Sequence, residues 1–279
     1  LAVAGVLTGA SLDISGDIDV DGTTNLDIVD IDGAVDMAST LQVDGAITGS
    51  STIVGSTING VGIKADITNF ANSILISNDA ATGTLSTATN NTGLGHNVFE
   101  SITSADENVA VGSQALKATT SGGGNIAIGK DSLIANTTGN TNIAIGTDAM
   151  TTNVAADRNV AVGEQALQNM TASSSTDTYN VGVGYNAGLS INSGVKNTFV
   201  GGRAGDATTT ANENTAVGYH SLGTNTTGAD NVALGAFSLF SSTTASFNTS
   251  VGSSAMETNT TGANNTAVGY QSLLANTTA

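Results

Sequence analysis

Apolar and polar positions alternate in short runs along the chain, and one such run recurs at a fixed spacing between residues 91 and 273. Each copy begins with Asn, continues with a β-branched residue, a usually small residue and an aliphatic residue, and ends with Gly, as at 108–112 and 125–129. The leading asparagines are Asn91, Asn108, Asn125, Asn142, Asn159, Asn180, Asn197, Asn214, Asn231, Asn248 and Asn265. Successive copies are 17 residues apart, except for one step of 21 residues after Asn159. Eleven copies at this pitch predict an array of similar units, each stacked on its neighbours.

The residue types in each repeat predict its local structure. Alternation over four residues with a β-branched second position favours a short strand, and the Gly at the fifth position favours a turn of the backbone. A second apolar pair, a small residue and then a large one, comes next in most copies, for example Ala115-Leu116 and Ser132-Leu133, and predicts a second short strand or a corner. The Asn-Thr-Thr-Gly segments at 136–139, 225–228 and 259–262 carry residues typical of turns. Each 17-residue unit is therefore interpreted as one coil.

A single coil of this size cannot bury its own apolar side chains, whereas stacked coils pair strand on strand at ~4.8 Å. The sequence therefore predicts an all-β fold, a parallel β-solenoid or β-roll of 17-residue coils about 50 Å long. Because the first strand is apolar on both faces, we expect one face to fill the roll and the other to meet a second copy of the chain. The expected assembly is a symmetric oligomer, with third-position alanines such as Ala110 and Ala127 near the symmetry axis or between rolls.

The repeats also carry a family resemblance. Units of the form Asn-Val-Ala-Val-Gly-x-x-Ala-Leu resemble the head repeats of trimeric autotransporter adhesins, which form a trimeric, left-handed parallel β-roll. They are even more similar to the Asn-Thr-Ala-Val-Gly-Tyr-Gln-Ala-Leu arrays in tail-fibre proteins of marine and cyanobacterial phages, and residues 265–273 give the best match. The resemblance implies that the symmetric oligomer is a homotrimer and that it forms an extracellular fibre, on a virion tail or, alternatively, a bacterial cell surface. Its implied partners are its own copies, other fibre or baseplate proteins, and a host-surface receptor.

Three further segments have compositions of their own. Residues 1–70 contain aspartate-rich runs of strict alternation that each end in Gly, at 12–16, 18–22, 29–33 and 41–45. These runs fit two-residue hairpins or the rungs of an intertwined three-chain β-stalk, and we favour the stalk because the repeats require partners. Residues 71–90 are predicted to be a transition. The additional residues within 168–179 are predicted to form a surface loop of the 91–279 roll.

Composition and charge exclude several function classes. The chain has no Cys, Pro or Trp, only 4% aromatic and 10% charged residues, and a formal net charge of −17. A nucleic-acid-binding surface requires Lys and Arg, of which there are only 6. No apolar run is long enough for a membrane span, and no paired carboxylates suggest a glycosidase. We therefore predict a protein that is not an enzyme and uses no cofactor. An ice-binding solenoid is disfavoured because the threonines lie in turn segments beside Asn and Gly.

Several motifs resemble sites and are given structural interpretations. Asp17, Asp19 and Asp21 open like a calcium loop, but the twelfth position is Ile28 instead of Glu, so an outward acidic strand that holds cations weakly is preferred. The segment 182–188 resembles a glycine-rich phosphate loop, yet Gly184 is the repeat glycine. The remaining candidates are His96 and His220, the Asn-Thr-Thr glycosylation motifs, and the tyrosines Tyr185, Tyr219 and Tyr270. The histidines have no carboxylate or Cys partner in register, the Asn-Thr-Thr motifs are explained by turn chemistry, and the tyrosines are interpreted as edge packing.

The eleven repeat asparagines are predicted to form a structural ladder, in which each side-chain amide bonds the next coil or an adjacent turn. A surface of near-identical coils offers no distinctive pocket. We therefore expect residues 91–279 to act as a rigid spacer in a fibre. Host recognition is then expected in a region beyond Ala279 or in the loop at 168–179, and the chain is expected to be part of a longer polypeptide.

Overall fold

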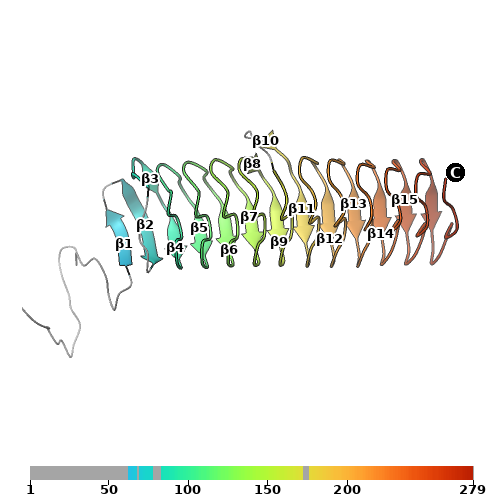
Figure 1. The fold of residues 1–279 in the computed structure, drawn as a ribbon, viewed down its shortest axis with the longest axis horizontal. Helices are drawn as coiled ribbons and strands as arrows, with labels where there is room; N and C mark the ends of the chain where they lie inside the picture. The colour runs from blue at the N-terminus through green and yellow to red at the C-terminus, as the bar shows by residue number, and fades with distance from the viewer. Residues whose placement is uncertain (1–61, 68, 78–82, 172–175, 279) are drawn as a thin grey trace, which may run out of the picture. The chain divides into compact units, whose positions relative to one another are not determined.

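A computed structural model describes residues 62–67, 69–77, 83–171 and 176–278, all within the unit Val54–Ala279. The predicted stalk up to residue 61, together with Asp17, Asp19 and Asp21, lies outside the described residues. The described part is all-β, and its principal feature is a stack of short parallel strands with a turn-rich return segment on each coil (Figure 1).

Each repeat contributes one three-residue strand to a single parallel sheet. The strands are β4 (Thr92–Leu94), β5 (Val109–Val111), β6 (Ile126–Ile128), β7 (Ile143–Ile145), β9 (Val160–Val162), β11 (Val181–Val183), β12 (Thr198–Val200), β13 (Thr215–Val217), β14 (Val232–Leu234), β15 (Thr249–Val251) and β16 (Thr266–Val268). Each strand pairs in register with the equivalent strand of the next repeat, so that Ala127 lies opposite Ala110 on one side and Ala144 on the other. The predicted parallel β-solenoid of 17-residue coils is confirmed.

An antiparallel hairpin lies at the N-terminal edge of the sheet. β1 (Gly62–Ile67) pairs with β2 (Phe70–Ser77), and β2 pairs in parallel with β4 through Ile74 and Thr92. The short strand β3 (Ala88–Thr89) also pairs with β2. β1 thereby occupies the edge of β2 that would otherwise leave its backbone groups unpaired.

The second apolar pair of each repeat forms a corner and not a second strand. Its large residue adopts a left-handed backbone conformation, with φ of 49° at both Leu116 and Leu133. The amide of Leu133 nevertheless donates to the carbonyl of Ala149 in the next coil at 3.0 Å. The corners therefore continue the hydrogen-bonded stacking of the coils although their dihedral angles are not those of a strand.

The repeat glycine that ends each strand is required for two reasons. Gly129 has φ of 132°, and a Cβ built on it would lie 2.5 Å from the carbonyl oxygen of Gly146 in the next coil. Backbones approach closely at this point, and L side chains rarely adopt the conformation. A side chain such as that of Val in place of Gly129 is therefore excluded on both counts.

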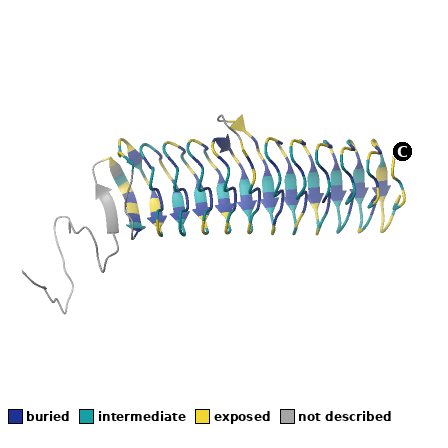
Figure 2. Ribbon diagram, in the orientation of Figure 1, coloured by how far each residue is buried: buried dark blue, intermediate teal, exposed yellow. Residues whose placement is uncertain are grey.

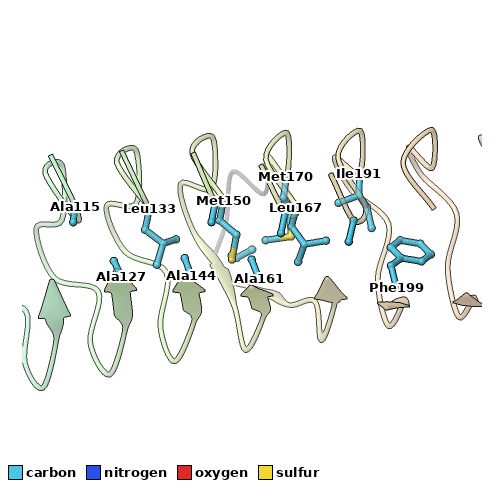
Figure 3. Close-up of a cluster of buried hydrophobic side chains, with 14 of the residues drawn as sticks. Ala115, Ala127, Leu133, Ala144, Met150, Ala161, Leu167, Met170, Ile191 and Phe199 are labelled. Carbon is cyan, nitrogen blue, oxygen red and sulfur yellow. The ribbon is translucent and has the colours of Figure 1, made fainter. Parts of the chain in front are cut away.

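The interior of the roll is filled by small residues on the strands and large residues at the corners. The third strand position, which includes Ala127, Ala144 and Ala161, is fully buried. It points toward the corner residues Leu133, Met150 and Leu167, as seen in Figure 3. The prediction that these alanines lie near a symmetry axis or between rolls is therefore wrong. They face inward because each coil is thin, and only a small side chain fits opposite Leu or Met.

The strand residues and the corner residues that face each other in the interior form two columns, and these compensate each other in volume. Where the strand position carries Phe199, the corner positions of its own coil and the preceding coil are Gly205 and Gly188. A Cβ on Gly205 would lie 2.5 Å from the Phe199 ring, and one on Gly188 would lie 2.8 Å from it. The reverse pairing occurs where Phe99 occupies the corner and Gly93 the strand. The width of the interior is thus fixed, and the bulky side chain that fills it can come from the strand or from the corner.

Candidate functional site: the outer face of the parallel sheet

The second and fourth residues of each repeat point away from the interior and form what we call the outer face. Its members are Thr92, Leu94, Val109, Val111, Ile126, Ile128, Ile143, Ile145, Val160, Val162, Val181, Val183, Thr198, Val200, Thr215, Val217, Val232, Leu234, Thr249, Val251, Thr266 and Val268. None is buried: Ile128 is 38% exposed and Ile145 is 37% exposed, while the residue between the two members of each pair is buried. Figure 2 shows this alternation along the strand arrows.

The outer face is apolar and carries no charge. Of its 22 residues, 17 are Val, Ile or Leu and the other five are Thr. Eleven strands at ~4.8 Å spacing and three residues at ~3.3 Å rise give a plane of about 500 Å². A continuous apolar surface of several hundred Å² on a water-soluble protein typically marks an interaction site. The outer face is therefore the strongest candidate for a functional surface among the described residues.

The repeat asparagines form a continuous hydrogen-bonded column in the interior. Asn142 is typical: its Nδ2 donates to Oδ1 of Asn125 at 3.2 Å and to the carbonyl of Ala156 at 2.8 Å. Its Oδ1 accepts from the backbone amide and the Nδ2 of Asn159 at 3.0 and 3.1 Å. Such bonds link each coil to the next and hold the coils in register. Because this column is buried along nearly all of its length, it is a structural feature and not a ligand site.

The ladder passes through the 21-residue step. The backbone amide of Asn180 donates to Oδ1 of Asn159 at 2.9 Å, and the Thr178 hydroxyl donates to the same oxygen at 2.7 Å. Part of the predicted loop at 168–179 also continues the coil, since β10 (Thr176–Asp177) pairs in parallel with β8 (Ala156–Asp157). Asp177 forms an ion pair with Arg158. Residues 172–175 lie outside the described part.

The two histidines, the glycine-rich segment and the three tyrosines singled out in the sequence do not converge on a single site. His96 and His220 lie seven coils apart, and no group of three or more His, Cys, Asp or Glu in the described segments could hold a metal ion. The glycine-rich segment 182–188 is explained by packing, because a Cβ on Gly182 would lie 2.9 Å from the Leu167 side chain. Tyr185, Tyr219 and Tyr270 lie on one column at the corner and are exposed.

The Asn-Thr-Thr-Gly segments serve the turns of the roll. Asn136, Asn225 and Asn259 are buried, and each Nδ2 donates to the carbonyl of the glycine three residues later, at 3.1, 2.9 and 2.9 Å. A glycosyl group would have no room at these buried amides. The threonine next to the asparagine uses its hydroxyl between coils: Thr226 donates to the carbonyl of Thr243 at 3.0 Å. These hydroxyls are engaged with the backbone, unlike a free array that could bind ice.

Charged groups are sparse, and four of the described cations, Lys117, Lys130, Arg158 and Lys196, form ion pairs at the surface. Lys196 lies 2.8 Å from Glu213 on the adjacent coil, and this contact raises the pKa of Lys196 and lowers the pKa of Glu213. Asp131 similarly raises the pKa of Lys130. Asp206 differs, because its partial burial raises the pKa of its carboxyl, while the nearby His220 and Arg203 act in the opposite direction.

The sequence predicts that one apolar strand face remains outside the roll, but the strand positions assigned to that face were wrong. The second and fourth positions do carry the larger aliphatic residues and the third the smaller ones, but this difference in size does not by itself decide which set faces inward. Comparisons with protein-family models, curated proteins and solved structures gave no match. In the described part of the chain, no helix is long and apolar enough to cross a membrane. What the fold defines is a β-solenoid, an architecture typical of structural proteins.

Proposed function

We propose that this chain is the shaft of an extracellular fibre, a rigid rod that assembles side by side with parallel copies of itself through the outer face. The observation that carries the proposal is the uncharged apolar character of that face on every coil from Thr92 to Val268. A single soluble rod would expose this surface to water along its full length, whereas association with identical copies removes it from water at no cost in unpaired charge.

The regularity of the roll supports a mechanical role. The coils are linked by backbone hydrogen bonds in the sheet and at the corners and by the asparagine ladder, so bending the rod requires many bonds to be strained together. The coil surface repeats with small variations and presents few groups that could activate a substrate. We therefore infer a protein that is not an enzyme and whose function is to hold other parts of a fibre at a distance.

The stoichiometry and the location are inferred from the resemblance of the repeats. We infer three copies per shaft and a phage tail fibre, with other fibre or baseplate proteins as neighbours and a host-binding region elsewhere in the fibre. A trimeric bacterial surface adhesin is the alternative. Immunogold labelling with antibodies against this chain distinguishes the two, because the tail fibre predicts label on virion tails and the adhesin predicts label on the cell surface.

Light scattering tests the assembly. We expect a mass three times the 27.4 kDa of the chain. The double variant Ile128→Lys and Ile145→Lys is expected to lower that mass to one chain, because it places buried charges in the interface. Thr138→Lys, a change at an exposed corner position, is the matched control and is expected to leave the trimer intact. A monomeric wild-type protein would contradict the proposal.

A cross-linking experiment covers the case in which the charged variant fails to fold. The chain contains no Cys, so Ile145→Cys introduces a single thiol on the outer face. In a parallel assembly with equal registers, these thiols meet near the symmetry axis and form disulfide-linked dimers upon mild oxidation. Thr138→Cys is expected to stay monomeric on a denaturing gel. Equal cross-linking of both variants would show that the outer face is not the interface.

A further inference from the structure

One corner of the roll breaks the repeat. We call it the aromatic patch and define it as Arg203, Asp206, Tyr219, His220, Phe237 and Phe240. Three of its members, Arg203, His220 and Phe237, occupy the second position after the repeat glycine in consecutive coils, just beyond β12, β13 and β14. In the other eight repeats this position is Asn, Gln, Asp or Ser. The patch is thus the one place on this column where rings and a guanidinium replace small polar groups.

The rings of the patch form a closely packed cluster. His220 and Phe237 are stacked, with an interplanar angle of 9° and ring centroids 5.8 Å apart. The Tyr219 ring packs edge to face on Phe237, with centroids 5.5 Å apart. Phe240, in the same coil as Phe237, also packs edge to face on it, with centroids 5.7 Å apart. Gly223 permits this packing, since a Cβ there would lie 2.9 Å from the Phe240 ring. Mutual contacts therefore hold the rings in place before any ligand arrives.

The Tyr219 ring remains accessible. It is 53% exposed, and its neighbours on the same column are Gly202 and Ala236, which are too small to cover it. A Cβ built on Gly202 would lie 3.5 Å from Cδ2 of Tyr219, so the ring rests over the glycine. An exposed aromatic ring on a rigid base offers an apolar platform to a ligand.

Polar groups lie beside this platform. Lys117, Lys130, Arg158 and Lys196 each form an ion pair with a carboxylate, whereas among the described side chains Arg203 makes no ion pair. Its Nη1 instead lies 3.4 Å from Nε2 of His220. A guanidinium can only donate, so Nε2 accepts, and the remaining N–H groups of Arg203 can donate elsewhere. Asp206 supplies an acceptor in the same coil.

We propose that the aromatic patch binds a hexose unit of a neutral saccharide. The C–H face of the sugar ring packs on Tyr219 and the adjoining edge of Phe237, while its hydroxyls accept from Arg203 and donate to Asp206. A neutral ligand fits better than a polyanion, because the formal charge of −17 repels anions and the patch holds one carboxylate beside its one guanidinium. The site is at a corner and does not depend on self-association through the outer face.

Fluorine NMR tests the proposal on the full chain labelled with 3-fluorotyrosine. The chain has four tyrosines, so each resonance can be assigned by a Tyr→Phe substitution. Maltohexaose, cellohexaose and mannohexaose serve as probes. We expect at least one of them to shift the Tyr219 resonance saturably. Tyr270, on the same column but without neighbouring patch residues, is the internal control and is expected not to shift.

The matched variants use residues that other coils carry at the same position, so that the roll is retained. Arg203→Gln copies Gln114 and Gln165, and Phe237→Ser copies Ser254. Each is expected to weaken binding about tenfold or more, whereas Lys196→Gln, which removes the same charge outside the patch, is expected to have no effect. Far-ultraviolet circular dichroism verifies that the fold is unchanged.

Three results would overturn the proposal. One is the absence of a Tyr219 shift with all three probes, and another is an equal shift of Tyr270, which would indicate non-specific contact. The third is tighter binding of chondroitin sulfate than of any neutral probe, which would assign the patch to polyanions. None of these results bears on the oligomeric mass, so failure of this site and failure of the fibre proposal remain distinguishable.

Discussion

The two faces of each strand in the roll differ in a way that reverses a common expectation. In β7, the inward residue Ala144 is fully buried, while the larger Ile145 on the outer face is 37% exposed. Large aliphatic side chains usually occupy the interior of a protein. Here the interior is only as wide as one alanine facing one leucine or methionine, so the larger strand residues point outward. A face on which most residues are large, apolar and uncharged is best explained if another surface covers it.

The two faces also differ in how strictly each residue is specified. Inside, a change of one side chain requires a compensating change across the coil, as Phe199 and Gly205 illustrate. Outside, Thr, Val, Ile and Leu exchange freely between repeats. The interior therefore determines the fold of one chain, while we propose that the outer face determines association. If this separation holds, changes to the coil interior reduce the stability of the single chain itself.

The largest expected effect comes from a deletion that breaks the register. Removing residues 125–141 deletes one complete coil, and we expect a shorter rod that still folds, because equivalent neighbours meet again. Removing only residues 125–132 places a strand over a corner and is expected to abolish folding. Circular dichroism and electron microscopy of both variants provide the measurement. Equal tolerance of the two deletions would contradict the solenoid.

The next largest effect tests the width of the interior. Phe199→Ala is expected to destabilise the roll by about 3–5 kcal/mol, because it leaves a cavity beside Gly188 and Gly205. Gly205→Leu alone is expected to be at least as damaging, since its Cβ would overlap the Phe199 ring. Together the two changes recreate the common alanine and leucine pairing.

The variant that combines Phe199→Ala with Gly205→Leu is the decisive part of this experiment. Gly205 has φ of 59°, close to the 49° that Leu116 adopts at the equivalent corner, so leucine is compatible with the backbone there. We expect urea unfolding to show recovery of most of the lost stability in the double variant. Strictly additive losses would show that the two positions do not face each other.

A smaller effect is expected from the polar part of the interior. Asn142→Ala removes four side-chain hydrogen bonds and leaves the amide of Asn159 and the carbonyl of Ala156 without these partners. The expected cost is about 2–4 kcal/mol, measured as a loss of amide protection in hydrogen exchange around coils 125–180. Thr138→Ala, at an exposed position of the same coil region, is the control, and a similar loss there would show that the ladder adds no specific stability.

The smallest expected effect is the pH dependence of Asp206. Burial raises its pKa above the ordinary value of 3.8, because the partly buried environment disfavours the charged carboxylate. The stabilisation from this group is present below pH 3.8 and is lost as the pH rises through the folded-state pKa. Asp206→Asn is therefore expected to raise the melting temperature slightly at pH 7, with the difference narrowing as the pH falls toward 4. A difference that does not vary with pH would exclude ionisation as its cause.

The repeat and the coil that it builds can be predicted from the order of the amino acids. The period of 17 residues, the short strand, the turn glycine and the parallel stacking all depend on local residue preferences and on the identity of neighbouring coils, and both are visible in one dimension. The column of asparagines was equally predictable, because identical residues at a constant period must lie side by side once the coils stack.

The choice of which strand face lies inside could be read only from the three-dimensional packing. Alternation divides a strand into two faces, but the choice between them depends on the distance across the coil to the corner, and no local pattern contains that distance. The same holds for the second apolar pair, which became a corner because Leu133 takes a left-handed conformation. It also holds for the aromatic patch, where Tyr219 and His220 of one coil contact Phe237 and Phe240 of the next. Short-range preferences specify the coil, and packing across and between coils specifies which side chains it presents to water.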